Sequence, residues 1–161
     1  MSIADGKKLG GRYLSFVLGE NTYAIPVGKV EVVLEMQPIT RVPNAQKNIC
    51  GVINHRGSVV PVIDLRVTFA AESKDSIESV SIVVLQVEFE GTLMSFGMLA
   101  DGVREVIDLD DTTIESIPEI AKGKRKQDGE GSDRFVQAIA RLADEFIILV
   151  DMDAVFQEVS A

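Results

Sequence analysis

The sequence predicts an all-β protein built from two similar small units, with a sandwich or barrel architecture. Three observations support this fold class: short runs rich in Val and Ile recur along the chain, turn residues separate the runs, and the second half repeats the pattern of the first. The chain has 161 residues, of which 46% are apolar. That length suits one domain of ordinary size, or two very small units that share a core.

The predicted strands follow one another with turns between them. Residues 12–18 (RYLSFVL) form the first strand, and the turn GENT leads into a second strand at 23–27. Later strands are expected within 49–54, 57–65, 80–89, 93–99, 135–142 and 146–152, separated by turns at Glu90-Gly91, Asp101-Gly102 and Asp144-Glu145. Only residues 30–36 and the tail 153–159 show a pattern that favours short helices.

An internal repeat underlies the two predicted units. A shift of 73 residues places Phe16 on Phe89 and Val33 on Val106. Further along, a shift of 87 residues is needed to match the VIDL that begins at Val62 with the later LVDM. The second copy must therefore contain an insertion.

The insertion corresponds to residues 121–134, a segment of 14 residues rich in Gly and charge. It is predicted to be a mobile surface loop. Its five basic and three acidic residues leave two interpretations open: contact with an acidic partner, or an ordinary solvated loop. We expect one domain at 12–156, made of units at roughly 12–70 and 79–156.

Composition argues against several classes of protein. The net charge of −9 disfavours binding to nucleic acid and to anionic membranes. The N-terminus lacks the apolar core of a signal peptide, and no apolar run is long enough for a transmembrane helix. Cys50 is the only cysteine, so it is expected to be a buried thiol in a reducing compartment. The protein is predicted to be soluble and cytoplasmic.

The residues that could carry chemistry are few. His55, the only histidine, could act as a general base oriented by Asp64 or Asp151, but it falls in a predicted turn where side chains are usually solvated. Ser58 lacks the G-x-S-x-G context of a nucleophile. The two aspartates occupy equivalent repeat positions, where capping of the following turn or helix is the favoured role. No metal-ligand or nucleotide-binding pattern is present, so no metal and no cofactor are expected.

The turn at 54–57 (NHRG) is the better candidate for function. Asn54 suits a turn that needs positive φ or a side-chain hydrogen bond, and Gly57 permits close backbone approach. Arg56 lies between them and should be exposed. Arginine is enriched at protein–protein hot spots, although a single surface arginine can also be merely solvated.

Three segments resemble the CheW family of bacterial chemotaxis coupling proteins. They read YLSFVLGENTYAIPVGKVEVVLE, ITRVPNAQKNICGVINHRGSVVPVIDLR and FGMLADGVREVIDL, and the match spans about 13–156. Departures are His55 where the family usually has Leu, Gln46 or Lys47 near the place of a second proline, Ala100 in the Val-Asp-x-Val motif, and the insertion at 121–134. Asn54, Arg56 and Gly57 all match the family pattern.

The resemblance implies two small SH3-like five-stranded β-barrels and a non-enzymatic adaptor. Such proteins couple methyl-accepting chemoreceptors to the histidine kinase CheA in arrays at the inner membrane. The implied partners are the regulatory domain of CheA and the cytoplasmic tip of the receptors. By motif position, the partner-binding residues would be Val30, Val33, Gly51, Asn54, Arg56, Gly57 and Val106. The valines would contact a receptor helix or the opposite barrel, and Arg56 would be a hydrogen-bonding anchor.

Alternative functions remain open from the sequence. The same scaffold could serve a chemosensory pathway that is not flagellar. Alternatively, the protein could be a small β-barrel enzyme that uses His55. A kinase fragment or a fusion with a phosphoreceiver is disfavoured, because the chain ends at Ala161 soon after the second unit.

Overall fold

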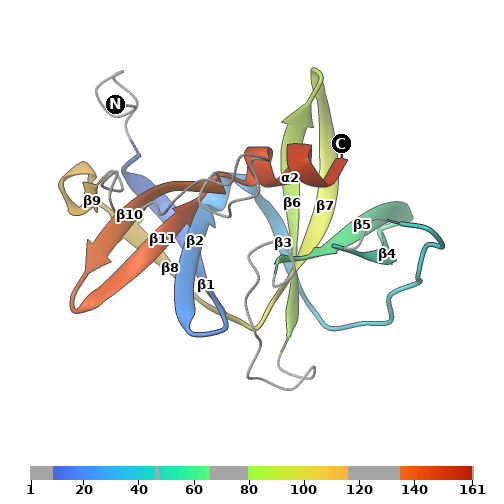
Figure 1. The fold of residues 1–161 in the computed structure, drawn as a ribbon, viewed down its shortest axis with the longest axis horizontal. Helices are drawn as coiled ribbons and strands as arrows, with labels where there is room; N and C mark the ends of the chain where they lie inside the picture. Colours follow the sequence, from blue (N-terminus) through green and yellow to red (C-terminus); the bar gives the residue numbers. More distant parts are fainter. Residues whose placement is uncertain (1–8, 46–47, 66–79, 116–134, 161) are drawn as a thin grey trace, which may run out of the picture.

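The computed structural model describes residues 9–45, 48–65, 80–115 and 135–160, and the segment 121–134 lies outside them. The described residues form two antiparallel-rich sheets, with α2 (Met152–Ser160) lying between them (Figure 1). Sheet A contains β1 (Gly11–Leu18), β2 (Asn21–Pro26), β8 (Gly102–Leu109), β9 (Ile114–Glu115), β10 (Val136–Leu142) and β11 (Glu145–Val150). Sheet B contains β3 (Val30–Glu35), β4 (Ile49–His55), β5 (Ser58–Asp64), β6 (Ser81–Phe89) and β7 (Thr92–Ala100). Single 3₁₀ turns occur at η2 (Val27–Lys29) and η4 (Asp111–Thr113).

The sheets do not follow the two halves of the sequence. Sheet A has the strand order β8-β1-β2-β11-β10-β9, so the first hairpin of the chain joins strands from its C-terminal half. Sheet B has the order β3-β6-β7-β5-β4, so the hairpin β6–β7 joins strands from the N-terminal half. Each repeat thus lends its first hairpin to the other sheet. The expected units at 12–70 and 79–156 are therefore wrong as a division of the strands between sheets.

The repeat itself is present strand by strand. Apart from β9, the two sheets have the same order when β1, β2, β8, β10 and β11 are matched to β6, β7, β3, β4 and β5. The parallel pairs agree in register, since Leu149 lies opposite Ala24 in sheet A and Val62 lies opposite Gly97 in sheet B. These residues differ by 87 and 73, the two shifts found in the sequence.

One predicted match is wrong. Phe16 lies opposite Val103, whereas Leu85 lies opposite Val30 in the equivalent pairing, so the counterpart of Phe16 is Leu85 and not Phe89. The β6–β7 ladder continues past the position at which β1–β2 turns. A longer hairpin moves the match on its first strand while leaving the second strand aligned.

Three apolar clusters hold the fold together. One lies within each sheet: residues such as Tyr13 and Leu149 in sheet A, and Ile53 and Val84 in sheet B. The third is shared, because the hairpins β1–β2 and β6–β7 pack against each other and against α2, where the rings of Phe96 and Phe156 lie 4.9 Å apart. We call this third cluster the shared core. It makes the two sheets one folding unit.

The helices are partly as predicted. The C-terminal helix is present as α2, but residues 30–35, expected to favour a helix, form strand β3. Their sequence VEVVLE alternates half-buried and exposed side chains, and a two-residue period belongs to a strand. Among the described residues, no helix has the length and apolar character needed to cross a membrane.

Candidate protein-docking surface

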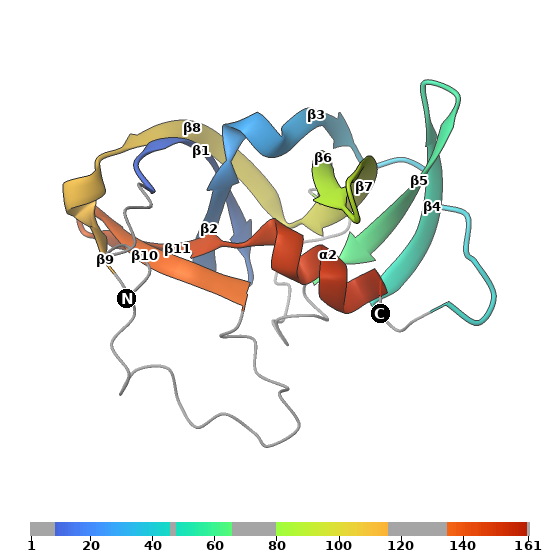
Figure 2. The same ribbon diagram turned by 90° about the horizontal axis from the view of Figure 1, so that it is seen from above.

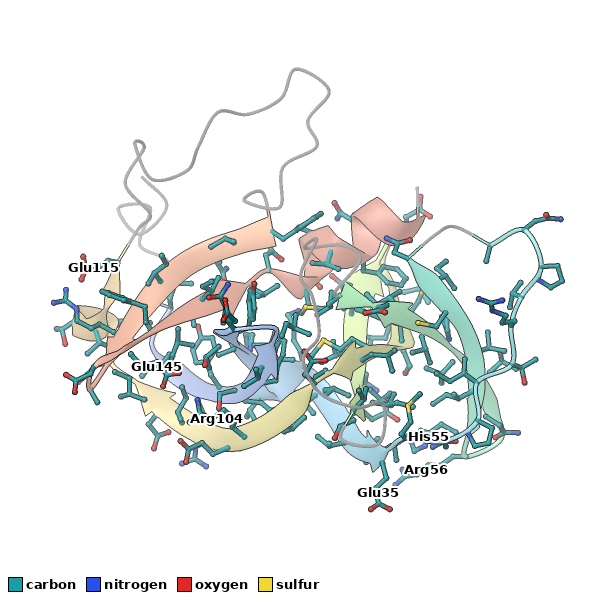
Figure 3. The ribbon with its side chains drawn as sticks, turned by 60° about the horizontal axis from the view of Figure 1, so that its bottom comes forward. Glu35, His55, Arg56, Arg104, Glu115 and Glu145 are labelled. Atoms are coloured by element: carbon teal, nitrogen blue, oxygen red, sulfur yellow. The ribbon has the colours of Figure 1, made fainter. Side chains whose placement is uncertain are left out.

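The turn between β4 and β5 is a tight hairpin with Arg56 and Gly57 at its tip. His55 pairs with Ser58, and Arg56 and Gly57 have φ of 53° and 81°. Positive φ at both central residues is the geometry of a type I′ turn, whose twist matches that of the flanking strands. The side-chain oxygen of Asn54 accepts a hydrogen bond from the N–H of Gly57 at 3.0 Å. Asn54 and Gly57 therefore fix the turn, as the sequence predicted, and leave Arg56 exposed at its end (Figure 3).

The sequence predicted a solvated His55, but its side chain points into the protein. It is the last residue of β4 and lies on the same side of the strand as the buried Ile53, so its side chain is only 13% exposed. Its Nε2 lies 3.5 Å from Oε2 of Glu31 on β3, and the hydroxyl of Ser95 on β7 donates to the other oxygen of Glu31 at 3.0 Å. The predicted turn at 54–57 began one residue too early, since His55 still belongs to β4, and a shift of one residue reverses the face of a strand.

Sheet A has an equivalent cluster at the same place. The counterparts of Glu31 and Ser95 under the shift of 73 are Arg104 and Thr22, and Arg104 donates to Oε2 of Glu145 at 3.1 Å. The Thr22 hydroxyl donates to the same oxygen at 2.6 Å, which holds the pKa of Glu145 below its ordinary value; Arg104 acts in the same direction, and burial partly opposes both. The counterpart of His55 under the shift of 87 is Leu142, which packs on the core of sheet A. Polar contacts that join strands thus recur in the two sheets. Figure 3 labels His55 in sheet B, and Arg104 and Glu145 in sheet A.

The two aspartates considered as catalytic partners have separate structural surroundings. The side chain of Asp151 accepts a hydrogen bond from the N–H of Ala154 at 3.2 Å and so caps the start of α2. The backbone N–H of Asp64 donates to the carbonyl of Asn48, as that of Asp151 does to Phe135. Within the described residues, no group of His, Cys, Asp and Glu side chains is arranged to hold a metal ion.

Gly51 is buried beneath the segment that covers the open edge of β4. Thr40 and Val52 exchange two backbone hydrogen bonds of 2.8 and 2.9 Å. A Cβ added to Gly51 would lie 2.2 Å from the carbonyl oxygen of Thr40, and Gly51 has φ of 151°. No other residue allows this approach of the two backbones. The geometry places Gly51 in the wall of sheet B, under the Thr40 segment.

The predicted valines lie on the two outer strands β3 and β8, at the side of the molecule away from α2 (Figure 2). Val33 is 41% exposed and Val106 is 50% exposed. They are equivalent, since Val33 lies opposite Val83 and Val106 opposite Leu14, the counterpart of Val83. Val30 is half-buried against the shared core, as is its counterpart Val103. The structure thus brings Val30 and Val33 together on β3 and places Val106 on the other sheet.

A second pair of exposed apolar side chains was missed in the sequence. Val59 on β5 is 73% exposed and Phe146 on β11 is 65% exposed. They are counterparts under the shift of 87. Both precede a buried position in strands that read as continuous apolar runs, so periodicity could not distinguish their faces. The repeat was the available signal, because it places an apolar residue at the same exposed position twice.

Comparison with known proteins connects this architecture with a family. The model of the CheW-like domain matches residues 12–160. The chain belongs to this family. It is 32% identical over 148 residues to the chemotaxis protein CheW of Klebsiella aerogenes, covering 92% of this chain and 82% of that protein. It is 30% identical to the chemotaxis protein CheW of Bacillus subtilis, covering 96% of this chain and 92% of that protein.

A solved structure of the family has the same fold. The scaffolding protein TtCheW from Thermoanaerobacter tengcongensis superposes with a TM-score of 0.76 at 28% identity, covering 93% of this chain and 90% of that chain. The predicted fold class of two SH3-like barrels is confirmed, with the addition of β9 as a sixth strand in sheet A. Membership of the CheW family, a family of adaptors, gives the chain a scaffolding role in chemotaxis.

Proposed function

We propose that this protein couples methyl-accepting chemoreceptors to the histidine kinase CheA by binding both, without catalysing a reaction itself. It would act in the cytoplasm, in receptor arrays at the inner membrane. The observation that carries the proposal is the pair of exposed valines, Val33 and Val106, at equivalent positions of the two sheets. A single exposed apolar residue is ordinary, but here the same exposed position is apolar in both copies of the strand, which supports a binding role.

The β3 valines are proposed to contact a receptor helix. Val33 is exposed, and Val30 on the same strand is half-buried against the shared core. The cytoplasmic tip of a receptor is a helical hairpin, and such helices dock by placing their apolar face on an apolar surface of the partner. Val106 would offer the corresponding contact on sheet A.

Arg56 is proposed to be the polar anchor of the surface. It is exposed at the end of a turn that Asn54 and Gly57 hold in one conformation. A rigid turn loses little conformational entropy when a partner binds, so more of the interaction energy contributes to affinity. The guanidinium of Arg56 can form paired hydrogen bonds with a carboxylate of the kinase or receptor. Gly51 would contribute indirectly, by keeping the edge of β4 closed beneath Thr40.

Two alternatives from the sequence are weighed by particular contacts. An enzyme that used His55 would need the imidazole in contact with substrate, whereas its side chain is turned toward Glu31 and is 13% exposed. That geometry favours the adaptor. A chemosensory pathway other than flagellar chemotaxis would use the same surface, so the identity of the bound receptors separates the two.

The proposal is tested by titrating the protein with a receptor cytoplasmic fragment and, separately, with the regulatory domain of CheA in a calorimeter. Arg56→Ala should weaken binding to at least one of them by about 2 kcal/mol, roughly 30-fold in Kd. Arg12→Ala is the matched control, because Arg12 is an exposed arginine on sheet A that pairs only with the exposed Asp108 among the described contacts. Equal, unchanged affinities for both variants would remove Arg56 from the proposed surface.

A further inference from the structure

The chain crosses between the two sheets at two short linkers, within the described residues. It passes from sheet A to sheet B through Val27–Lys29, and it returns between β7 and β8 at the single residue Asp101. Each linker is followed at once by a strand that carries one of the exposed valines. The position of Val33 relative to Val106 therefore depends on how firmly these crossings are held.

Asp101 joins the second crossing to sheet A. Its backbone N–H donates to the carbonyl oxygen of Val17 at 3.0 Å, and its carboxyl oxygen accepts from the N–H of Gly19 at 2.8 Å. Both partners belong to the β1–β2 hairpin. The residue is only 2% exposed, although burying a carboxyl group is costly unless hydrogen bonds compensate. A buried acid in a one-residue linker therefore fixes the point at which the chain enters sheet A.

The first crossing is held in a different way. The residue equivalent to Asp101 under the shift of 73 is Gly28, which is exposed and has open space around its Cα. The neighbouring Lys29 instead bonds to both carboxyl oxygens of Asp153 on α2, at 3.0 and 3.2 Å. These side chains are 34% and 41% exposed, so solvent weakens the pair. Of the two crossings, that at Asp101 is the more firmly fixed.

From these contacts we propose that Asp101 is a positioning residue for partner binding. It holds β8 so that Val103 and Val106 keep a fixed relation to Val30 and Val33 across the shared core. In this proposal a receptor helix contacts both sheets and needs this relation, whereas the kinase domain contacts only the β4–β5 turn and does not. The role rests on the proposed function.

Binding to two partners provides the first test. Asp101→Asn keeps the shape of the side chain but weakens the bond to Gly19, and Asp101→Ala removes that bond. Each variant should bind the receptor fragment at least about tenfold more weakly, with less than about twofold change for the kinase domain. Ile107→Val, a core change in sheet A of the kind that costs about 1 kcal/mol, is the control for general loss of stability and should leave both affinities unchanged. An equal loss for both partners, or no loss in a folded variant, would overturn the positioning role.

A distance measurement separates this inference from the proposed function. In a Cys50→Ala background, spin labels at positions 35 on β3 and 110 after β8 would report the distance between the two sheets. Glu35 and Asp110 are both exposed. The distances between the two labels should have a narrow distribution with Asp101 present. The Asp101→Asn variant should give a broader or shifted distribution. Identical distributions would contradict the inference even if receptor binding is confirmed. If the wild-type protein binds no receptor, the proposed function fails, while the labels still decide whether Asp101 orients the sheets.

Discussion

Val33 and Val106 occupy the same position in two copies of one strand. Val33 lies opposite Val83 in sheet B, and Val106 lies opposite Leu14 in sheet A. The partners are buried in the shared core, whereas the two outer valines are 41% and 50% exposed. The fold thus repeats an exposed apolar residue beside a buried one on each outer strand.

Val33→Glu should weaken binding of the receptor fragment by at least about tenfold, because a charged side chain would be buried in an apolar contact. Its effect on the free energy of unfolding should be about 1 kcal/mol or less, since the side chain is 41% exposed. Calorimetric titration and urea unfolding measure the two effects. Leu93→Glu on β7 is the control, because Leu93 is also exposed but lies at the tip of the β6–β7 hairpin. The same affinity in both variants would show that Val33 is not a contact.

His55→Leu should fold and should still support kinase activation. Nε2 of His55 is buried without a hydrogen-bond partner among the described residues, and Leu142 shows that leucine packs at the equivalent position. Removing an unsatisfied buried group usually costs little stability or increases it. His55→Asp, by contrast, would place a second carboxylate beside Glu31 and should lower the free energy of unfolding by about 2 kcal/mol. A folded His55→Leu protein with no signalling function would favour the enzyme alternative.

Gly51→Ala should lower the free energy of unfolding by about 2–4 kcal/mol. The new Cβ would meet the Thr40 carbonyl at 2.2 Å and would force either the strand or the covering segment to move. Gly28→Ala is the control, because its Cβ would meet nothing within 4 Å. Urea unfolding should show a change of less than about 1 kcal/mol for Gly28→Ala. Similar stabilities for the two variants would contradict the close packing of β4 against Thr40.

Protonation of Glu145 should lower the stability of the folded protein in acid. Its pKa is below the ordinary value of 4.5, chiefly because the Thr22 hydroxyl donates to the carboxylate. A carboxyl group whose pKa is lowered by folding stabilises the folded state above its unfolded pKa. That contribution is lost as the pH falls through the folded pKa.

Glu145→Gln should therefore be less stable than the wild-type protein at pH 7, and the difference should shrink as the pH falls below the ordinary value of 4.5. Urea unfolding over this range measures the difference. Glu90→Gln, in the exposed turn of β6–β7, is the control for the loss of a surface carboxylate. A gap between Glu145→Gln and wild type that stays the same at all pH values would contradict the role of Thr22.

The sequence predicted eight of the strands and their succession, because apolar runs and turn residues are local signals. It missed β8 and β9, and it expected the residues of β3 to favour a helix. It also predicted that Val33 and Val106 are equivalent, and the strand register confirms this. It could not predict which sheet receives each hairpin. Hydrogen bonds between β1 and β8, or between β3 and β6, join segments far apart in the chain and leave no mark in the local pattern.

Single residues in the candidate site show the same limit. Asn54 and Gly57 were predicted as turn residues because their chemistry is local, and the bond between them agrees. His55 and Gly51 could not be understood locally. The face of His55 depends on where the turn begins, and the need for glycine at position 51 arises from Thr40, a residue brought in from outside the strand.

The central claim is that this protein links receptors to the kinase. The most direct test adds the purified protein to a receptor fragment and CheA and measures kinase autophosphorylation. We predict that the wild-type protein increases kinase activity only when receptor is present, and that Arg56→Ala gives a clearly smaller increase at the same concentration. A kinase rate that stays unchanged at saturating concentrations of the wild-type protein, with both partners folded, would contradict the account.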